Sequence, residues 1–219
     1  MNTGHASHWG RRSVLFAVGI NVLAIGTALF ACCGLGVSAL VAVPEVLSLL
    51  LPVTLGQMTT VFFIILVIIE LCLLRSFRWR VIAQMGVALV FGWIVDFYGL
   101  TIGFDRLPVK LLWQQLLVTI LAVIFTSLGV FMMVRADLVL NPPDGAVHVI
   151  ARKAGMAFGT TKFLFDLLMI VVAIALSLLF LRHIAAIGLG TALAVLLVGE
   201  LISVWEKLFG PRRPASEAS

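Results

Sequence analysis

Long apolar runs recur along this chain, and they constrain its fold more than any other feature of the sequence. A helix needs about 17 to 25 mostly apolar residues to cross the hydrocarbon core of a bilayer. Six runs meet that length: about Ser13 to Cys33, Met58 to Leu74, Val81 to Thr101, Leu111 to Val134, Thr160 to Phe180 and Ile184 to Leu208. Only 11% of the residues are charged, whereas a soluble domain carries about a quarter. The sequence therefore predicts an all-α membrane protein with six transmembrane helices.

The basic residues are unevenly distributed between the segments that join these runs. With the N-terminus in the cytoplasm, twelve of the fifteen Lys and Arg residues fall on the inner side, and the other three are Arg106, Lys110 and Arg182. Because membrane proteins concentrate Lys and Arg in cytoplasmic loops, we expect the tails, residues 1–12 and 209–219, to be cytoplasmic. The same bias accounts for the net charge of +5. The expected partner is therefore the lipid bilayer and not a nucleic acid.

Two further segments are apolar but interrupted by glycine and proline. Residues 34–57 contain Pro44 and Pro52 and are too broken to span a membrane as one helix, so we expect them to re-enter the membrane or to lie at its interface. The same alternatives hold for residues 137–158. In that segment Asn141, Pro142, Pro143 and Gly145 predict a structural turn, because proline fixes φ and glycine permits positive φ. A short helix is expected to follow, from Ala146 to Ala154.

The two halves of the chain, residues 13–105 and 106–208, repeat each other weakly. A shift of 103 residues places Gly26 on Gly129 and lays segment 34–57 over 137–160, and a shift of 107 places Gly92 on Gly199. Each half has three predicted spans, so the second half must enter the membrane in the opposite orientation. Two inverted three-helix repeats, each with a short broken or re-entrant segment, form a recurrent transporter plan.

Several of these residues resemble a known family. Pro142, Asp144 and Gly145, the stretch from Gly34 to Ser38, and the stretch from Gly188 to Gly199 are similar to the YczE/YitT-like bacterial integral membrane proteins, and specifically to the YczE-like branch. The chain departs from that pattern at Ala39 and Val41, where the family has Pro and Asp. The resemblance covers residues 14–208. It implies a multi-pass protein of the bacterial inner (plasma) membrane, of transport-like character and without an assigned substrate.

Three polar residues of the second broken segment are candidates for a substrate or ion pathway. Asp144 has two interpretations: it completes the turn or caps the following helix, or it faces a vestibule and meets a cation, a proton or an amine. His148 and Arg152 lie one helical turn apart on one face. They either contact lipid phosphates or receive an anionic substrate at the cytoplasmic mouth.

Further pathway candidates are charged residues inside the predicted spans, where a charge is costly unless it is paired or hydrated. They are Glu70, Asp96, Lys162, Asp166 and Glu200. Lys162 and Asp166 have i, i+4 spacing, so they either neutralise each other or take part in the pathway. The depths of the others place Asp96 towards the outer side and Glu70 and Glu200 towards the cytoplasmic side.

Other kinds of site are not indicated by the sequence. It has no Gly-x-Ser-x-Gly nucleophile elbow, no His-Glu-x-x-His pattern and no phosphate-binding loop, and its three cysteines lack metal-ligand spacing. We therefore expect neither an enzyme nor a metal or cofactor site. The sequence favours a secondary, permease-like transporter of a small molecule or an ion, with a homodimer left open. The alternatives are the substrate-binding subunit of an importer with a separate energy-coupling ATPase, and a regulatory or assembly membrane protein.

Overall fold

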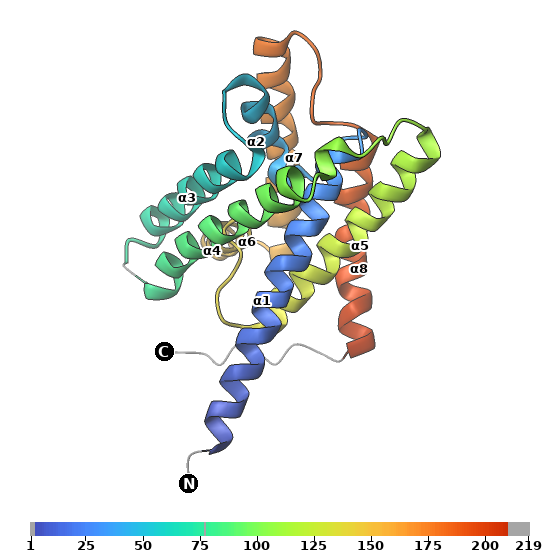
Figure 1. Ribbon diagram of the computed structural model, residues 1–219. Helices are drawn as coiled ribbons and strands as arrows, with labels where there is room; N and C mark the ends of the chain where they lie inside the picture. Colours follow the sequence, from blue (N-terminus) through green and yellow to red (C-terminus); the bar gives the residue numbers. More distant parts are fainter. Residues whose placement is uncertain (1–2, 77, 210–219) are drawn as a thin grey trace.

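The computed structural model describes residues 3–76 and 78–209, and its side chains from Trp9 onwards. In this part of the chain six helices are long and apolar enough to cross a membrane (Figure 1). They are α1 (Thr3–Cys32), α3 (Leu55–Leu74), α4 (Trp79–Asp96), α5 (Leu112–Ala136), α7 (Phe158–Leu176) and α8 (Leu189–Phe209). Two π-helical turns, η1 (Phe97–Thr101) and η3 (Ser177–Leu181), extend α4 and α7. The predicted six-helix membrane fold is confirmed, although α1 begins inside the expected tail.

Three shorter elements lie between the long helices: α2 (Ala39–Leu50), η2 (Phe104–Arg106) and α6 (Pro142–Ala154). The predicted turn at Pro142 and Pro143 is wrong, because these residues form the first turn of α6, with Asn141 at its N-cap position. Proline is tolerated there because the first amides of a helix have no intrahelical acceptor. Asp144 and Gly145 are therefore helical residues, and their side chains have the fixed directions of a helix.

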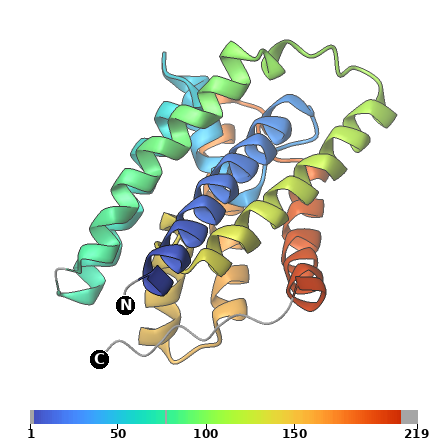
Figure 2. The same cartoon turned by 60° about the horizontal axis from the view of Figure 1, so that its bottom comes forward.

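The centre of the bundle is the crossing of α1 and α5, which lie side by side (Figure 2). A Cβ atom at Gly26 would lie 2.7 Å from the Thr126 nitrogen, and one at Gly129 would lie 2.5 Å from the Leu23 nitrogen. Both distances are shorter than van der Waals contact. The two backbones approach this closely because both positions are glycine, as is usual where membrane helices cross tightly.

The two halves of the chain are joined again by their short helices and loops. Helix α2 packs on α7, and α6 packs on α3. The loop after α1 also meets the loop before α8: the Val37 amide donates to the Ala186 carbonyl at 2.9 Å, and the Gly190 amide donates to the Leu35 carbonyl at 2.7 Å. The Thr191 hydroxyl donates to the Val37 carbonyl at 2.7 Å. These contacts hold the start of α2 in place.

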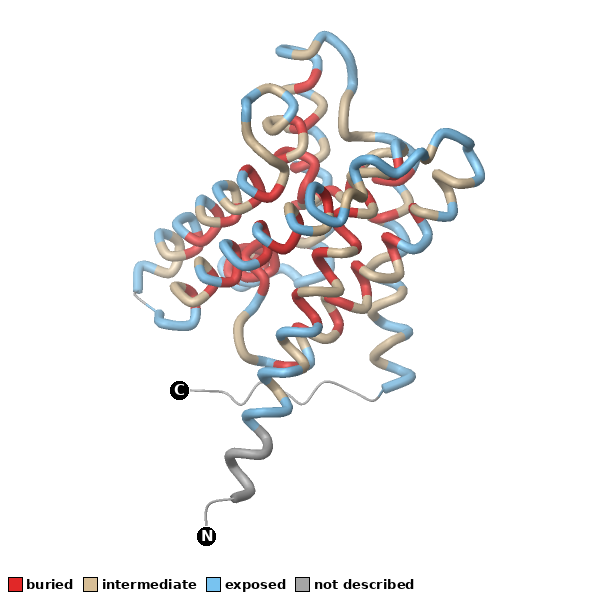
Figure 3. Tube along the Cα trace, viewed as in Figure 1, coloured by how far each residue is buried: buried red, intermediate tan, exposed pale blue. Residues whose placement is uncertain are grey.

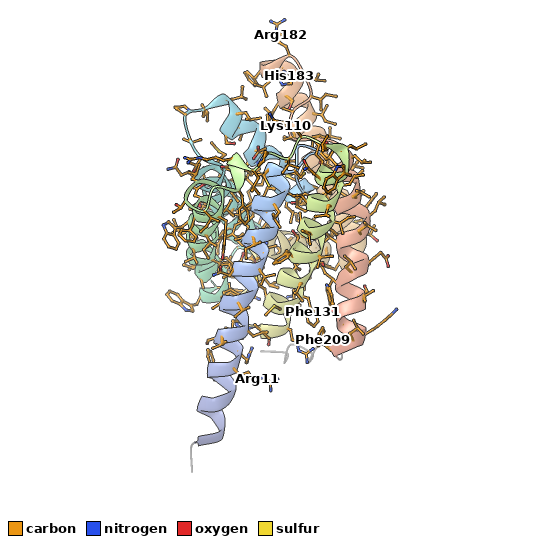
Figure 4. The ribbon with its side chains drawn as sticks, turned by 45° about the vertical axis from the view of Figure 1, so that its right-hand side comes forward. Arg11, Lys110, Phe131, Arg182, His183 and Phe209 are labelled. Atoms are coloured by element: carbon orange, nitrogen blue, oxygen red, sulfur yellow. The ribbon has the colours of Figure 1, made fainter. Side chains whose placement is uncertain are left out.

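The surface of the bundle is largely apolar, whereas buried residues gather in its middle (Figure 3). Large side chains stand exposed on the outer faces of the spanning helices, for example Leu179 and Leu196. Such continuous apolar surface is unusual on a soluble monomer and suits contact with hydrocarbon. Lys110, Arg182 and His183 lie at one end of the bundle, and Arg11 lies towards the other (Figure 4).

Candidate functional site

A cavity of about 480 Å³ lies among α1, α2, α3 and α4. It lies where α4 ends and the segment that leads to α5 begins. Its polar wall consists of Glu45, Ser48, Thr54, Asp96 and Asp105. The rest of its lining is apolar or small and includes Ala28, Cys32 and Leu100. Its volume lies in the range of about 300 to 1,000 Å³ that is typical of small-molecule sites.

Glu45 is the most enclosed carboxyl of this cavity. It lies in the middle of α2, directly after the fully buried Pro44. The Glu45 Oε2 atom is buried, and no donor among the described residues reaches it. Helix α2 is shorter than the six spanning helices and is not one of them. Burial, together with the nearby Asp105 carboxylate, raises the pKa of Glu45 to about 7. Glu45 therefore has a buried oxygen that lacks a hydrogen-bond donor among the described residues.

Asp96, in contrast, is already engaged by the protein. Its Oδ1 atom accepts a hydrogen bond from the Gly56 amide at 2.8 Å, and its Oδ2 atom accepts one from the Thr54 hydroxyl. The donors are the N-cap residue Thr54 and Gly56 in the first turn of α3, so Asp96 joins the end of α4 to the start of α3. The helix crossing is tight, because a Cβ atom at Gly56 would lie 2.1 Å from the Gly92 carbonyl oxygen. We conclude that Asp96 mainly positions the wall of the cavity.

Asp105 lies at the mouth of the cavity. It is exposed, and its oxygens lie near Gly99, where a Cβ atom would be 3.1 Å from Oδ2. No Lys, Arg or His side chain belongs to the described lining of the cavity. The described residues also contain no group of three His, Cys, Asp or Glu side chains placed to hold a metal ion. The cavity is therefore negative without being a preformed metal site.

A second polar cluster is buried where α3, α4 and α6 meet, and it contains Glu70 and Gln84. Glu70 and Gln84 are each 3% exposed, and the Gln84 amide hydrogen-bonds to the Glu70 carboxyl. Gly145 of α6 lies directly against both side chains. Asp144 is also buried and lines a small void with Asn141. That void is lined by Val130, Met133 and Val134 of α5 and not by Glu70. The structure thus places Glu70 against α6 at Gly145, whereas Asp144 lines a separate void beside α5.

The remaining predicted candidates lie outside both clusters. Lys162 Nζ and Asp166 Oδ1 are 2.7 Å apart and form an ion pair, in agreement with their i, i+4 spacing. His148 and Arg152 are exposed on α6, and the His148 ring lies 6.4 Å from the Phe158 ring. Glu200 is exposed on α8. No hydrogen bond, ion pair or ring contact among the described residues joins these side chains to Glu45 or Glu70.

Sequence reasoning missed Glu45 and Asp105 as members of a site. The sequence did contain a signal for Glu45, because an acid inside an apolar segment is costly unless it is paired or hydrated. Glu45 lies in residues 34–57, outside the six predicted spans. Asp105 lies in the short 3-10 element η2 between the ends of α4 and α5, where an acidic residue is ordinary. The element that carries Asp105, η2, packs on α1 and η1, and its closeness to Glu45 across the cavity is not visible in the sequence.

Comparison with known proteins identifies the family of the chain but no individual relative. No curated protein and no solved structure matches the chain. A family model described as "Family of unknown function (DUF6198)" matches residues 10–207, which is nearly the whole chain. The YczE/YitT-like resemblance remains an expectation, since this match does not name those proteins. The chain belongs to the DUF6198 family of unknown function.

Proposed function

We propose that the protein is a small-solute membrane transporter and that the cavity beside Glu45 is its solute site. The observation that carries this proposal is the cavity itself: about 480 Å³, open on one side, bounded by four helices and lined by three carboxyl groups. A protein whose sole role is structural has no need of a buried carboxyl without a partner, because burying an unpaired charge is costly. With both termini in the cytoplasm, the cavity opens to the outside.

The charge of the cavity favours a cationic solute. Glu45 has an unpaired oxygen and Asp105 lies at the mouth, while no basic side chain is among the described residues of the lining. The apolar part of the wall suits carbon atoms. A small organic ammonium ion combines both properties, and it would supply the hydrogen-bond donors that Glu45 lacks.

Pairs of equivalent contacts support an inverted repeat, which is the arrangement of many transporters. Under the shift of 103 residues Leu23 falls on Thr126 and Gly26 on Gly129. The close contact between Gly26 and Thr126 therefore has its counterpart in the contact between Gly129 and Leu23. The packing of α2 on α7 likewise corresponds to that of α6 on α3. We infer that a two-fold axis relates the halves and that the cavity faces one of two alternating sides.

The natural Cys32 provides a direct test, because it lines the cavity. In a variant that lacks Cys33 and Cys72, Cys32 is the remaining thiol. A small thiol reagent with an ammonium group, added outside intact cells, should label Cys32 faster than a sulfonate reagent of the same size. Glu45→Gln should reduce that preference. Equal labelling by the two reagents, or labelling from the cytoplasmic side alone, would contradict the proposal.

A second candidate, a membrane subunit that works with a partner protein, is favoured by one observation. Gly199 and Glu200 are exposed on α8, and a Cβ atom at Gly199 would meet nothing within 4 Å. A charged side chain on the outer face of a spanning helix is costly in lipid, and another protein would cover it. Purification from native membranes in mild detergent tests this candidate. Recovery of an ATPase that is lost in Glu200→Leu would support it, and a solitary protein would count against it.

A further inference from the structure

The buried pair of Glu70 and Gln84 is not explained by the cavity, because it lies at the junction of α3, α4 and α6. Both side chains are 3% exposed. The Gln84 amide group hydrogen-bonds to the Glu70 carboxyl. Two oxygens, Glu70 Oε2 and Gln84 Oε1, nevertheless have no donor among the described residues, and both are buried. Such unpaired buried acceptors are rare and call for an explanation.

Gly145 makes room for this pair. A Cβ atom at Gly145 would lie 2.6 Å from Glu70 Oε2, 2.7 Å from Gln84 Nε2 and 2.8 Å from Gln84 Oε1. The three polar atoms therefore converge on one point above the α6 backbone. Any other residue at this position would push the carboxyl and the amide aside. Helix α6 thus covers the Glu70 and Gln84 side chains at Gly145, the one glycine of this helix.

No cation neutralises Glu70 in this part of the chain. The ion pairs of the described residues join Arg12 to Asp137 and Lys162 to Asp166. The charged or titratable groups on the helices packed against α3 are Glu45 on α2, Arg80 and Asp96 on α4, and Asp144, His148, Arg152 and Lys153 on α6. All the basic ones among them are exposed.

A single proton satisfies both unpaired oxygens. An ionised carboxylate accepts hydrogen bonds and donates none, so Glu70 and Gln84 then present two acceptors to each other. A protonated carboxyl gains one O–H donor. It donates to the Gln84 oxygen while the Gln84 amide donates back, and the acid and the amide form a closed pair. The closed pair also removes the charge that burial penalises.

We propose that Glu70 and Gln84 form a proton-binding site, loaded while α6 is closed over it and emptied when α6 moves away and admits water. The O–H bond of Glu70 then breaks, the proton passes to the admitted water, and no other covalent bond changes. The role of this site as the coupling site of transport rests on the proposed function, whereas proton binding itself does not. The site lies under the helix with exposed basic residues, so its proton exchanges with that end of the bundle.

Infrared spectroscopy of the full-length protein in lipid nanodiscs tests the proposal without any solute. A protonated carboxyl has a carbonyl band at higher frequency than a carboxylate, and the band shifts in heavy water. At neutral pH the wild type should show this band, and Glu70→Gln should lose one carboxyl's share of it. Asp137→Asn, which removes a partly exposed carboxyl that pairs with Arg12 outside the spanning helices, is the control and should leave the band unchanged. A wild-type band that is the same in Glu70→Gln would overturn the proposal.

A second variant keeps the test informative if Glu70→Gln does not fold. Gln84→Leu preserves the carboxyl but removes its amide partner, so the band should persist at a higher frequency; an unshifted band would contradict the pairing. Uptake of methylammonium into reconstituted vesicles, measured with and without an inward proton gradient, separates the claim of transport from the claim of proton binding. A band without any transport would refute the transporter and leave the proton site standing. Transport that ignores the gradient, together with no band, would refute the proton site alone.

Discussion

Replacing Glu45 by Gln should make the ligand-free protein more stable at alkaline pH. The substitution keeps the size of the side chain and removes its charge. Burial, together with Asp105, raises the pKa of Glu45 from 4.5 to about 7. A carboxyl whose pKa is raised in the folded state binds its proton more tightly there than in the unfolded chain. Its contribution to stability is complete below pH 4.5 and is lost as the pH rises to about 7.

The size of the effect follows from the same shift. Each pKa unit corresponds to about 1.4 kcal/mol, so the change from 4.5 to about 7 is on the order of 3 kcal/mol. For a chain of 150 to 250 residues this amounts to roughly 6 to 12 °C in melting temperature. Water in the cavity screens part of the charge, so these values are the upper end of the expected change.

The assay is thermal unfolding of the detergent-purified protein across this pH range. The wild-type melting temperature should fall as the pH rises from 4.5 to about 7, and Glu45→Gln should lack that part of the decrease. Asp105→Asn, which removes the nearby negative charge, should reduce the slope without abolishing it. Asp137→Asn changes a partly exposed carboxyl outside the spanning helices and should follow the wild-type slope. If Glu45→Gln has the same slope as the wild type, or is less stable at alkaline pH, the account of a buried and unpaired carboxyl is refuted.

Three further substitutions test the packing. Gly129→Leu should separate α1 from α5 and lower the free energy of unfolding by at least about 3 kcal/mol, because its Cβ would lie 2.5 Å from the Leu23 nitrogen. The control is Gly159→Leu, where a Cβ atom would meet nothing within 4 Å. This control should leave the size-exclusion elution profile and the melting temperature unchanged. Asp96→Asn weakens the acceptor of two hydrogen bonds and should lower stability by about 1 to 3 kcal/mol, as thermal unfolding would reveal. Asp137→Asn breaks a partly exposed ion pair with Arg12, so the expected loss is under about 1 kcal/mol and should vanish in high salt; a larger, salt-independent loss would contradict this reasoning.

The spanning helices were predictable because their signal is local. A run of apolar residues fixes a spanning helix wherever its neighbours lie. The Lys162–Asp166 ion pair was predictable for the same reason, since residues four apart share a helix face. The start of α6 was not. Pro-Pro-Asp-Gly suits both a turn and the first turn of a helix, and the packing of α6 on α3 decides between them.

The candidate sites depend on contacts between distant parts of the chain. Gly145 meets Glu70 and Gln84 because α6 crosses α3 and α4, and no local pattern indicates that crossing. Glu45 and Asp105 come together across the cavity in the same way. The sequence did identify Glu70, Asp96 and Asp144 as polar groups that need partners. It did not indicate that Asp96 has two donors from α3.

The central claim, that a small cation is transported through the cavity beside Glu45, is tested most directly by recording currents from reconstituted vesicles. Vesicles adsorbed on a sensor would be exposed to jumps of methylammonium, ethanolamine or putrescine, and to acetate or phosphate as anionic controls. The account predicts a transient current with at least one ammonium ion that is absent in Glu45→Gln and retained in Glu200→Gln. Currents carried by the anions alone, or an undiminished ammonium current in Glu45→Gln, would contradict it.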